Sequence, residues 1–132
     1  MNALEDAIYD KLAAATAVTN LVSTRIYRSA APQGAAYPFV IIQLQAGGED
    51  NKISPDSLDI TYQVRAEVST SSADAGTIDE AIRTALHEAI LTVTGWTMFY
   101  AARGQMFRSH ISDADGTKRW IAGAFYRYRL TQ

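Results

Sequence analysis

The segment 58–68 alternates strictly between apolar and polar side chains, and this pattern constrains the fold more than any other part of the chain. The apolar positions are Leu58, Ile60, Tyr62, Val64, Ala66 and Val68. The polar positions between them are Asp59, Thr61, Gln63, Arg65 and Glu67. Because successive side chains of a strand point to opposite faces, the pattern predicts a strand with one buried face and one face turned to water or to a partner.

The C-terminal segment 118–130 has the same alternation. One face would carry Trp120, Ala122, Ala124, Tyr126, Tyr128 and Leu130. The opposite face would carry Ile121, Phe125, Arg127 and Arg129. Two such strands require something apolar to cover their buried faces.

Two shorter strands are predicted just before this segment. They would span 96–101 and 106–111, with the Arg-Gly pair at 103–104 as the turn between them. The Asp-Gly pair at 115–116 is typical of a tight turn and would lead into the last strand.

Two segments have the period of an amphipathic helix. In the first, the face is formed by Leu4, Ala7, Ile8, Lys11, Leu12 and Ala15, with the lysine as its only polar member. In the second, the apolar stripe is formed by Ile78, Ala81, Ile82, Ala85, Leu86, Ala89 and Ile90. Ser71 or Ser72 can cap the second helix. A sheet is the surface on which both helices can pack.

The region between the first helix and the alternating strand is punctuated by turn residues. Residues 25–28 are expected to form a short strand. Pro38 lacks a backbone donor and therefore belongs at the start or edge of the strand 39–44, which is apolar on both faces and expected to be covered on both sides. Residues 46–57 have no periodicity and are predicted to form a long exposed loop.

The order of helix, strands, helix and strands predicts a single α+β domain over residues 1–132. Its sheet would be mixed and mostly antiparallel, with two main helices packed on it. The chain holds 14 acidic and 12 basic residues, a net charge of −2, which argues against a protein whose main task is to grip a phosphate backbone. It contains no cysteine, so disulfides and thiolate metal sites are excluded.

No membrane span or signal peptide is predicted. No apolar run approaches the ~20 residues that a membrane-spanning helix needs. The N-terminal segment MNALEDAIYD carries acids where a signal peptide carries bases. We therefore expect the protein to be made in the cytoplasm and to stay there or to be built into a particle there.

Catalytic, metal and cofactor sites are not indicated. His87 and His110 stand without the spacing of a metal site, and no G-x-S-x-G or phosphate-loop motif is present. The stretch SDADGTK begins like a calcium loop, but Lys118 stands where the loop needs glycine and Ala124 where it needs glutamate. A hairpin turn explains this stretch better, and we expect no enzyme activity and no cofactor.

Arg127 and Arg129 admit two interpretations. They could form a basic stripe that meets an acidic partner or DNA. Alternatively, they could form cross-strand pairs with acids such as Asp59 or Glu67 on a solvated sheet face, which is the interpretation we favour.

The N-terminal part, LEDAIYDKLAAATAVTNLVSTRIYRSAAPQGAAYPFVIIQL, resembles the tail completion, or tail terminator, family of long flexible-tailed bacteriophages and prophages. The features that carry the resemblance are the amphipathic helix, the Arg-Ile-Tyr strand at 25–27, the APQG segment at 31–34 and the Tyr-Pro pair before the apolar strand. The resemblance continues through the alternating strand and second helix to the aromatic strand AFYRYRL, and it is weakest over 92–112.

This resemblance implies a structural virion protein without catalytic residues. Such a protein is expected to form a hexameric ring on the head-proximal end of the tail tube, to stop tube polymerisation and to join the tail to the head connector and neck proteins. Genomic DNA would pass through the ring without being read. The alternatives are a head-completion or neck adaptor ring, a DNA-binding accessory protein and a small-ligand binding domain or enzyme, which a pocket around His110 and Asp113 or Asp115 would favour.

Two sets of residues are candidates for contacts in such an assembly. The candidate interface loop would reach a neighbouring ring or the tail tube protein, and it comprises Gly47, Gly48, Glu49, Asp50, Asn51, Lys52, Ser54, Pro55 and Asp56. The candidate charges for the contact between subunits are Arg65, Glu67, Arg127 and Arg129.

Overall fold

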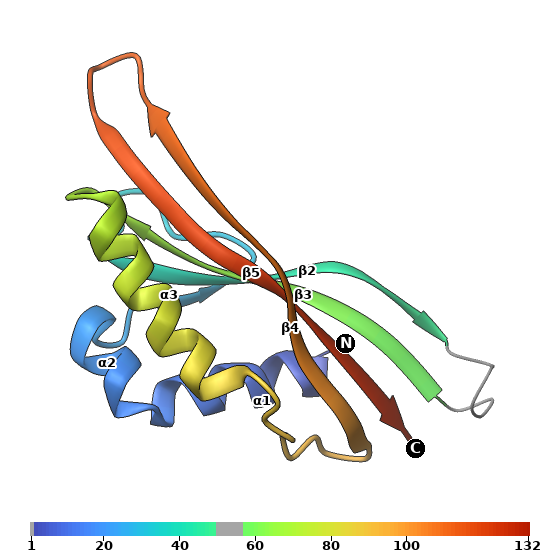
Figure 1. Cartoon of the computed structure of the whole chain (residues 1–132). Helices are drawn as coiled ribbons and strands as arrows, with labels where there is room; N and C mark the ends of the chain where they lie inside the picture. The colour runs from blue at the N-terminus through green and yellow to red at the C-terminus, as the bar shows by residue number, and fades with distance from the viewer. Residues whose placement is uncertain (1, 50–56) are drawn as a thin grey trace.

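A computed structural model describes residues 2–49 and 57–132 of the chain (Figure 1). The elements follow one another in the order α1 (Asn2–Ala14), α2 (Thr16–Val22), β1 (Ile26–Arg28), β2 (Phe39–Glu49), β3 (Ser57–Val68), α3 (Ser72–Leu86), β4 (Thr97–Ser112) and β5 (Lys118–Thr131). None of the helices in these residues is long and apolar enough to cross a membrane.

The strands form one mixed sheet in the order β1-β2-β3-β5-β4. β1 runs parallel to β2, and all other neighbours are antiparallel. The three helices lie on one side of this twisted sheet (Figure 1). The predicted α+β class and mixed, mostly antiparallel sheet are therefore confirmed, with α2 as a short additional helix.

The core lies between the helices and one face of the sheet. On β3 and β5 this face carries the predicted apolar positions, including the fully buried rings of Tyr62, Tyr126 and Tyr128. α1 contributes its stripe of Leu4, Ile8 and Leu12, and α3 contributes Ile78, Ile82 and Leu86. Each buried aliphatic side chain of this kind stabilises the fold by about 1.5–3 kcal/mol. The alternation in the sequence is thus the direct cause of the two-layer arrangement.

α3 begins where predicted and ends earlier. The Ser71 side chain accepts a hydrogen bond of 3.1 Å from the Asp74 backbone N–H, as an N-cap does. The expected continuation to Ile90 is wrong, because the chain leaves the helix at His87, whose Nδ1 accepts a hydrogen bond of 3.1 Å from the Arg103 backbone N–H. The side chain of Ile90 is consequently 61% exposed.

The predicted turn at 103–104 is also wrong, since β4 is one continuous strand. Its pairing with β5 shifts register at two places, between Met98 and Tyr100 and between Arg103 and Met106. A bulge of this kind inserts an extra residue into a strand and bends it without ending it. β4 and β5 together form a long hairpin whose turn projects beyond the helices (Figure 1).

The predicted loop at 46–57 is shorter than expected. β2 continues to Glu49 and β3 already begins at Ser57, so Gly47, Gly48 and Glu49 of the candidate loop are strand residues. A Cβ on Gly47 would come within 3.0 Å of Ile60, so glycine allows β2 to run close to that side chain. The remaining candidates, Asp50, Asn51, Lys52, Ser54, Pro55 and Asp56, lie outside the described residues.

Candidate functional site

The face of the sheet opposite the helices, called the open face below, carries the polar positions of the alternating strands. No described helix packs on it. Its side chains come from four strands and include Gln43, Asp59, Gln63, Arg65, Glu67, Phe107, Ser109, Ile111, Arg119, Ile121, Phe125, Arg127 and Arg129. The described strands thus bring charged, amide and aromatic side chains together on one surface.

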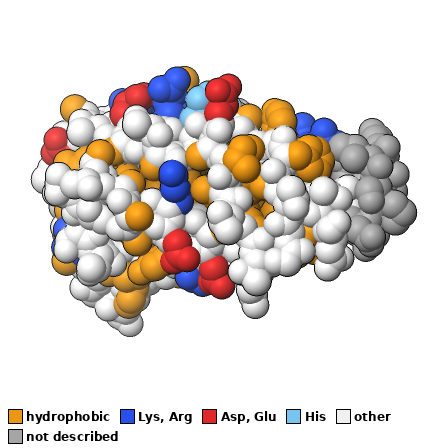
Figure 2. All heavy atoms as spheres, turned by 90° about the horizontal axis from the view of Figure 1, so that it is seen from below, with side chains coloured by type: hydrophobic (Ala, Val, Ile, Leu, Met, Phe, Trp, Pro, Cys, Tyr) orange, Lys and Arg blue, Asp and Glu red, His pale blue; other side chains and the backbone are white. Residues whose placement is uncertain are grey.

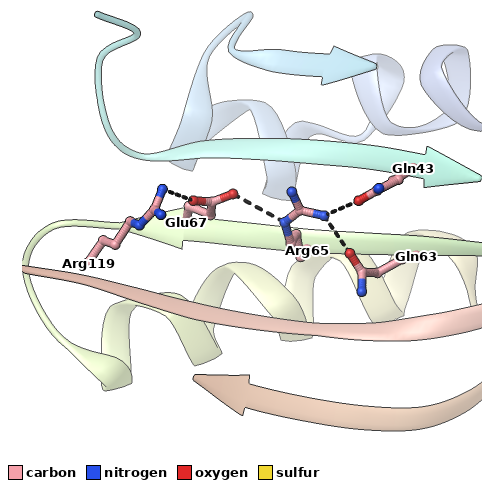
Figure 3. A network of polar contacts seen from close by, with 5 residues as sticks. All are labelled: Gln43, Gln63, Arg65, Glu67 and Arg119. Carbon is pink, nitrogen blue, oxygen red and sulfur yellow. Dashed lines mark hydrogen bonds and ion pairs between the residues drawn. The ribbon is translucent and has the colours of Figure 1, made fainter. Parts of the chain in front are cut away.

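A polar network runs across three strands of this face (Figure 3). Arg65 donates from Nη1 to the Gln43 Oε1 atom at 2.6 Å and also bonds the side-chain oxygen of Gln63. Its Nε donates to Glu67 at 3.2 Å, and Arg119 approaches the other Glu67 oxygen at 3.4 Å. The Glu67 side chain is only 4% exposed, so its charge is held between two guanidinium groups. Each side chain of the network therefore has a partner within the subunit.

Gly123 makes room for this network. It pairs with Arg65 across β3 and β5, and a Cβ there would lie 2.7 Å from both the Arg65 Cβ and the Val64 carbonyl oxygen. A glycine inside a strand commonly marks such a close approach of two backbones. Next to it lies a shallow groove of about 360 Å³, whose lining comprises Gln63, Arg65, Glu67, Phe107, Ser109, Ile111, Arg119 and Ile121.

A second charged cluster lies further along the same face. Arg127 donates from Nε to Asp59 at 2.9 Å, and its Nη2 atom also bonds the carboxylate. The hydrogen bonds from Arg127 hold the pKa of Asp59 below its usual value of 3.8. The guanidinium carbons of Arg127 and Arg129 lie 5.9 Å and 5.4 Å from the ring centroids of Tyr100 and Phe99, within the range of cation–π contacts.

The open face has the opposite charge balance to the whole chain. Its described side chains include four arginines and two carboxylates, an excess of positive charge, whereas the chain as a whole has a net charge of −2. The view from below, toward α1, shows hydrophobic side chains in separate places with charges of both signs between them (Figure 2). The open face is thus the better candidate for contact with an acidic or polar partner surface.

All four predicted interface charges lie on the open face. Arg65, Glu67 and Arg127 have partners within the chain, and Arg127 pairs with Asp59 as the favoured interpretation expected. Their contact with a neighbouring subunit stays a prediction. Sequence reasoning did not single out Gln43, Arg119 or Gly123 as part of a site. Only Gly123 gave a signal, as a glycine within an otherwise aromatic strand.

The groups considered for catalysis are not brought together. His87 accepts the backbone hydrogen bond from β4, whereas His110 packs on Trp120 with ring centroids 5.1 Å apart. Asp115 accepts a hydrogen bond of 2.9 Å from the Thr117 N–H, which lowers its pKa and closes the hairpin turn. Within residues 2–49 and 57–132, no three side chains are arranged to hold a metal ion.

Comparisons with known proteins give one family model and a number of similar solved structures, including the two that follow. The family model described as "Tail completion protein gp17" matches residues 6–121. A chain of the "Virion of native gene transfer agent (GTA) particle" has a TM-score of 0.76 at 19% sequence identity, covering 99% of this chain and 96% of that one. The "Structure of bacteriophage SPP1 gp17 protein" has a TM-score of 0.56 at 21% sequence identity, covering 99% of this chain and 89% of that one. No curated protein sequence matches.

Proposed function

The chain belongs to the tail completion protein gp17 family of phage virion proteins, and we propose that it caps the head-proximal end of a tail tube as a ring and joins it to the head connector. Membership in this family makes the chain a structural component of a phage-type tail. The ring, the end of tube polymerisation and the passage of genomic DNA through the centre are the finer parts of the proposal.

The observation that supports a joining role is the open face of the sheet. A subunit that must contact neighbours needs a surface whose charged groups are already placed, because ordering long side chains on binding costs about 0.5–1.5 kcal/mol each. The Arg65–Glu67 network meets this need, since its members are held by partners on three strands. Contact between unlike surfaces of identical subunits is what closes a ring.

The proposal assigns two contacts. The charges Arg65, Glu67, Arg127 and Arg129 would meet a neighbouring subunit, and the segment from Gly47 to Ser57 would face the tube or an adjacent ring. We expect deletion of residues 51–55 to leave the subunit folded, as judged by circular dichroism, and to impair joining of tails to heads. Joining at the wild-type level by this variant would remove the segment from the proposal.

Complementation of tails assembled without the protein tests the proposal directly. Purified tail tubes are mixed with the purified chain and imaged by negative stain, then mixed with filled heads. We expect a cap on one end of each tube, tubes of defined length and restored joining. A chain that attaches to heads and leaves tube ends bare would be a neck adaptor instead. A chain that attaches to neither would overturn the proposal.

A further inference from the structure

The two edges of the sheet are unlike each other, and each has a stretch without a described strand beside it, although on β4 the Arg103 backbone N–H already donates to His87 Nδ1 at 3.1 Å. β4 has β5 on one side and no described strand on the other. At the opposite edge, β1 covers only residues 40–42 of β2, so the outer edge of β2 from Gln43 to Glu49 has no described strand beside it. An open edge presents unpaired backbone N–H and C=O groups, for which another strand is the natural partner.

Each open segment contains a β-bulge, which is one of the features that protect a sheet edge, but neither contains a proline. Proteins usually guard exposed edges with charged residues or proline. The free part of β2 reads QLQAGG over residues 43–48, and the first part of β4 reads TMFYAA over residues 97–102. Neither of these two stretches contains a charge or a proline, although charged residues make up 20% of the chain, and the charged residues Glu49 and Arg103 follow directly after them. Two bulges on β4 restrict which strand can pair with it.

Exposed apolar side chains collect at these same edges. Leu44 on β2 is 49% exposed, and Phe99, Tyr100 and Met106 on β4 are 41%, 40% and 67% exposed. Leu44 and Met106 both belong to the helix-facing side of the sheet, because they pair with Tyr62 and Ala124, which face the helices. If a second copy extended the sheet, Leu44 of one copy and Met106 of the other would lie on the helix-facing side, whereas Tyr100, which pairs with Arg129, would lie on the open face.

Strand direction decides how two copies could meet. β5 runs parallel to β2 because β3 is antiparallel to both, and β4 is antiparallel to β5. β4 therefore runs opposite to β2. When a second copy continues the sheet in the same orientation, its β2 edge lies antiparallel to the first copy's β4 edge, which is the commoner arrangement of neighbouring strands.

We propose that the β4 edge of one subunit pairs with the β2 edge of the next, so that the sheets of adjacent subunits are continuous around the assembly. The proposal rests on the ring of the proposed function and adds backbone pairing at the sheet edges to the contact that the proposed function assigns to the open-face charges. The register through β3 and β5 puts Ala46 level with Ala102, by way of Thr61 and Arg127. These two alanines lie on the open face and define the expected pairing without a stagger.

Cysteine cross-linking tests the pairing, because the chain has no cysteine of its own. The variant Ala46→Cys/Ala102→Cys is oxidised both free at high concentration and after mixing with tail tubes. A second variant, Ala46→Cys/Tyr100→Cys, tests a register in which the neighbouring β2 is shifted by two residues along β4. We expect disulfide-linked oligomers on a non-reducing gel from at least one of them, since strand pairing brings Cα atoms within the ~4.4–6.8 Å that a disulfide spans. Ala46→Cys/Ser109→Cys is the control, because Ser109 lies on the same face at a distant level of β4.

Charged edge variants provide an independent measurement. Leu44→Lys and Tyr100→Lys should each abolish ring formation on tube ends, whereas Leu21→Lys, at a leucine 36% exposed on α2, should leave it intact. Rings that form normally with both edge variants, without cross-links, would overturn the edge pairing and leave the capping function standing. Cross-linked oligomers that do not attach to tubes would support the pairing and refute the function. Cross-links to the tube protein alone would assign the edge to that partner and overturn the proposal.

Discussion

Gly123 is the position where one added methyl group should have the largest effect on the open face. A Cβ built there lies 2.7 Å from the Arg65 Cβ and 2.7 Å from the Val64 carbonyl oxygen, and both contacts involve parts of β3 that cannot rotate away. Gly123→Ala must therefore push β5 from β3 in the middle of the sheet. Overpacking of this kind costs about 1–3 kcal/mol. Urea unfolding should show the midpoint lowered by roughly 1 M, given a slope of about 1–3 kcal/mol per M.

Gly104→Ala is the matched control in the neighbouring strand. A Cβ at Gly104 meets only the Phe125 carbonyl oxygen, at 3.4 Å, which is an ordinary contact. This variant should be neutral or gain up to about 1 kcal/mol from the less flexible unfolded chain. A Gly123→Ala protein as stable as the wild type, or a Gly104→Ala protein equally destabilised, would refute the argument that close strand contact requires glycine at 123.

Three further predictions concern charges and capping. Asp79→Asn should cost about 3–5 kcal/mol in urea unfolding, because it leaves the Arg103 guanidinium buried without its counter-charge, both side chains being 8% exposed. Ser71→Ala should cost about 0.5–2 kcal/mol by removing the cap of α3. The Asp59–Arg127 pair lowers the pKa of Asp59 in the folded state, so its stabilisation is present above pH 3.8 and is lost as the pH falls through the lower folded value. The difference in unfolding free energy between wild type and Asp59→Asn, about 0.2–1 kcal/mol at neutral pH, should therefore vanish in acid.

The changes at Asp79 and Ser71 each have a neighbouring control. Glu80→Gln alters an exposed acid on the same helix as Asp79 and should change stability by no more than about 0.5 kcal/mol. Ser72→Ala removes a hydroxyl adjacent to the cap without touching the bond from Ser71. If Glu80→Gln lost as much stability as Asp79→Asn, the loss would not come from the buried ion pair. If Ser72→Ala lost as much stability as Ser71→Ala, the loss would not come from the cap. A difference between wild type and Asp59→Asn that grew as the pH fell below 3.8 would argue against the sign derived for the Asp59 pKa.

The local pattern of the sequence predicted the layers of the fold well. Alternation over 58–68 and 118–130 assigned each side chain to the helix-covered or the open face, because burial of one face is enforced residue by residue along a strand. The same reasoning placed all four candidate charges on one surface. Those inferences needed only the two-residue period with which side chains alternate between the faces of a strand.

Features that depend on contacts between distant segments escaped prediction. The end of α3 and the continuity of β4 are both set where β4 meets α3, through His87, Asp79 and the backbone and side chain of Arg103. An Arg-Gly pair has the composition of a turn, and only these partners reveal it as part of a bulged strand. The joining of Gln43 and Arg119 to the Arg65–Glu67 network likewise depends on the strand register, which no single segment encodes.

The open face separates residues that hold the subunit together from residues that can meet a neighbour. Glu67 is buried between Arg65 and Arg119, so Glu67→Gln should lower the urea midpoint of the isolated subunit, since it leaves two guanidinium groups without their shared counter-charge. The Arg127 side chain is 50% exposed, so Arg127→Glu should change subunit stability little and weaken assembly, measured as capped tube ends at increasing salt. Assembly untouched by Arg127→Glu would remove Arg127 from the interface. Equal losses of subunit stability in the two variants would refute this division between fold and contact residues.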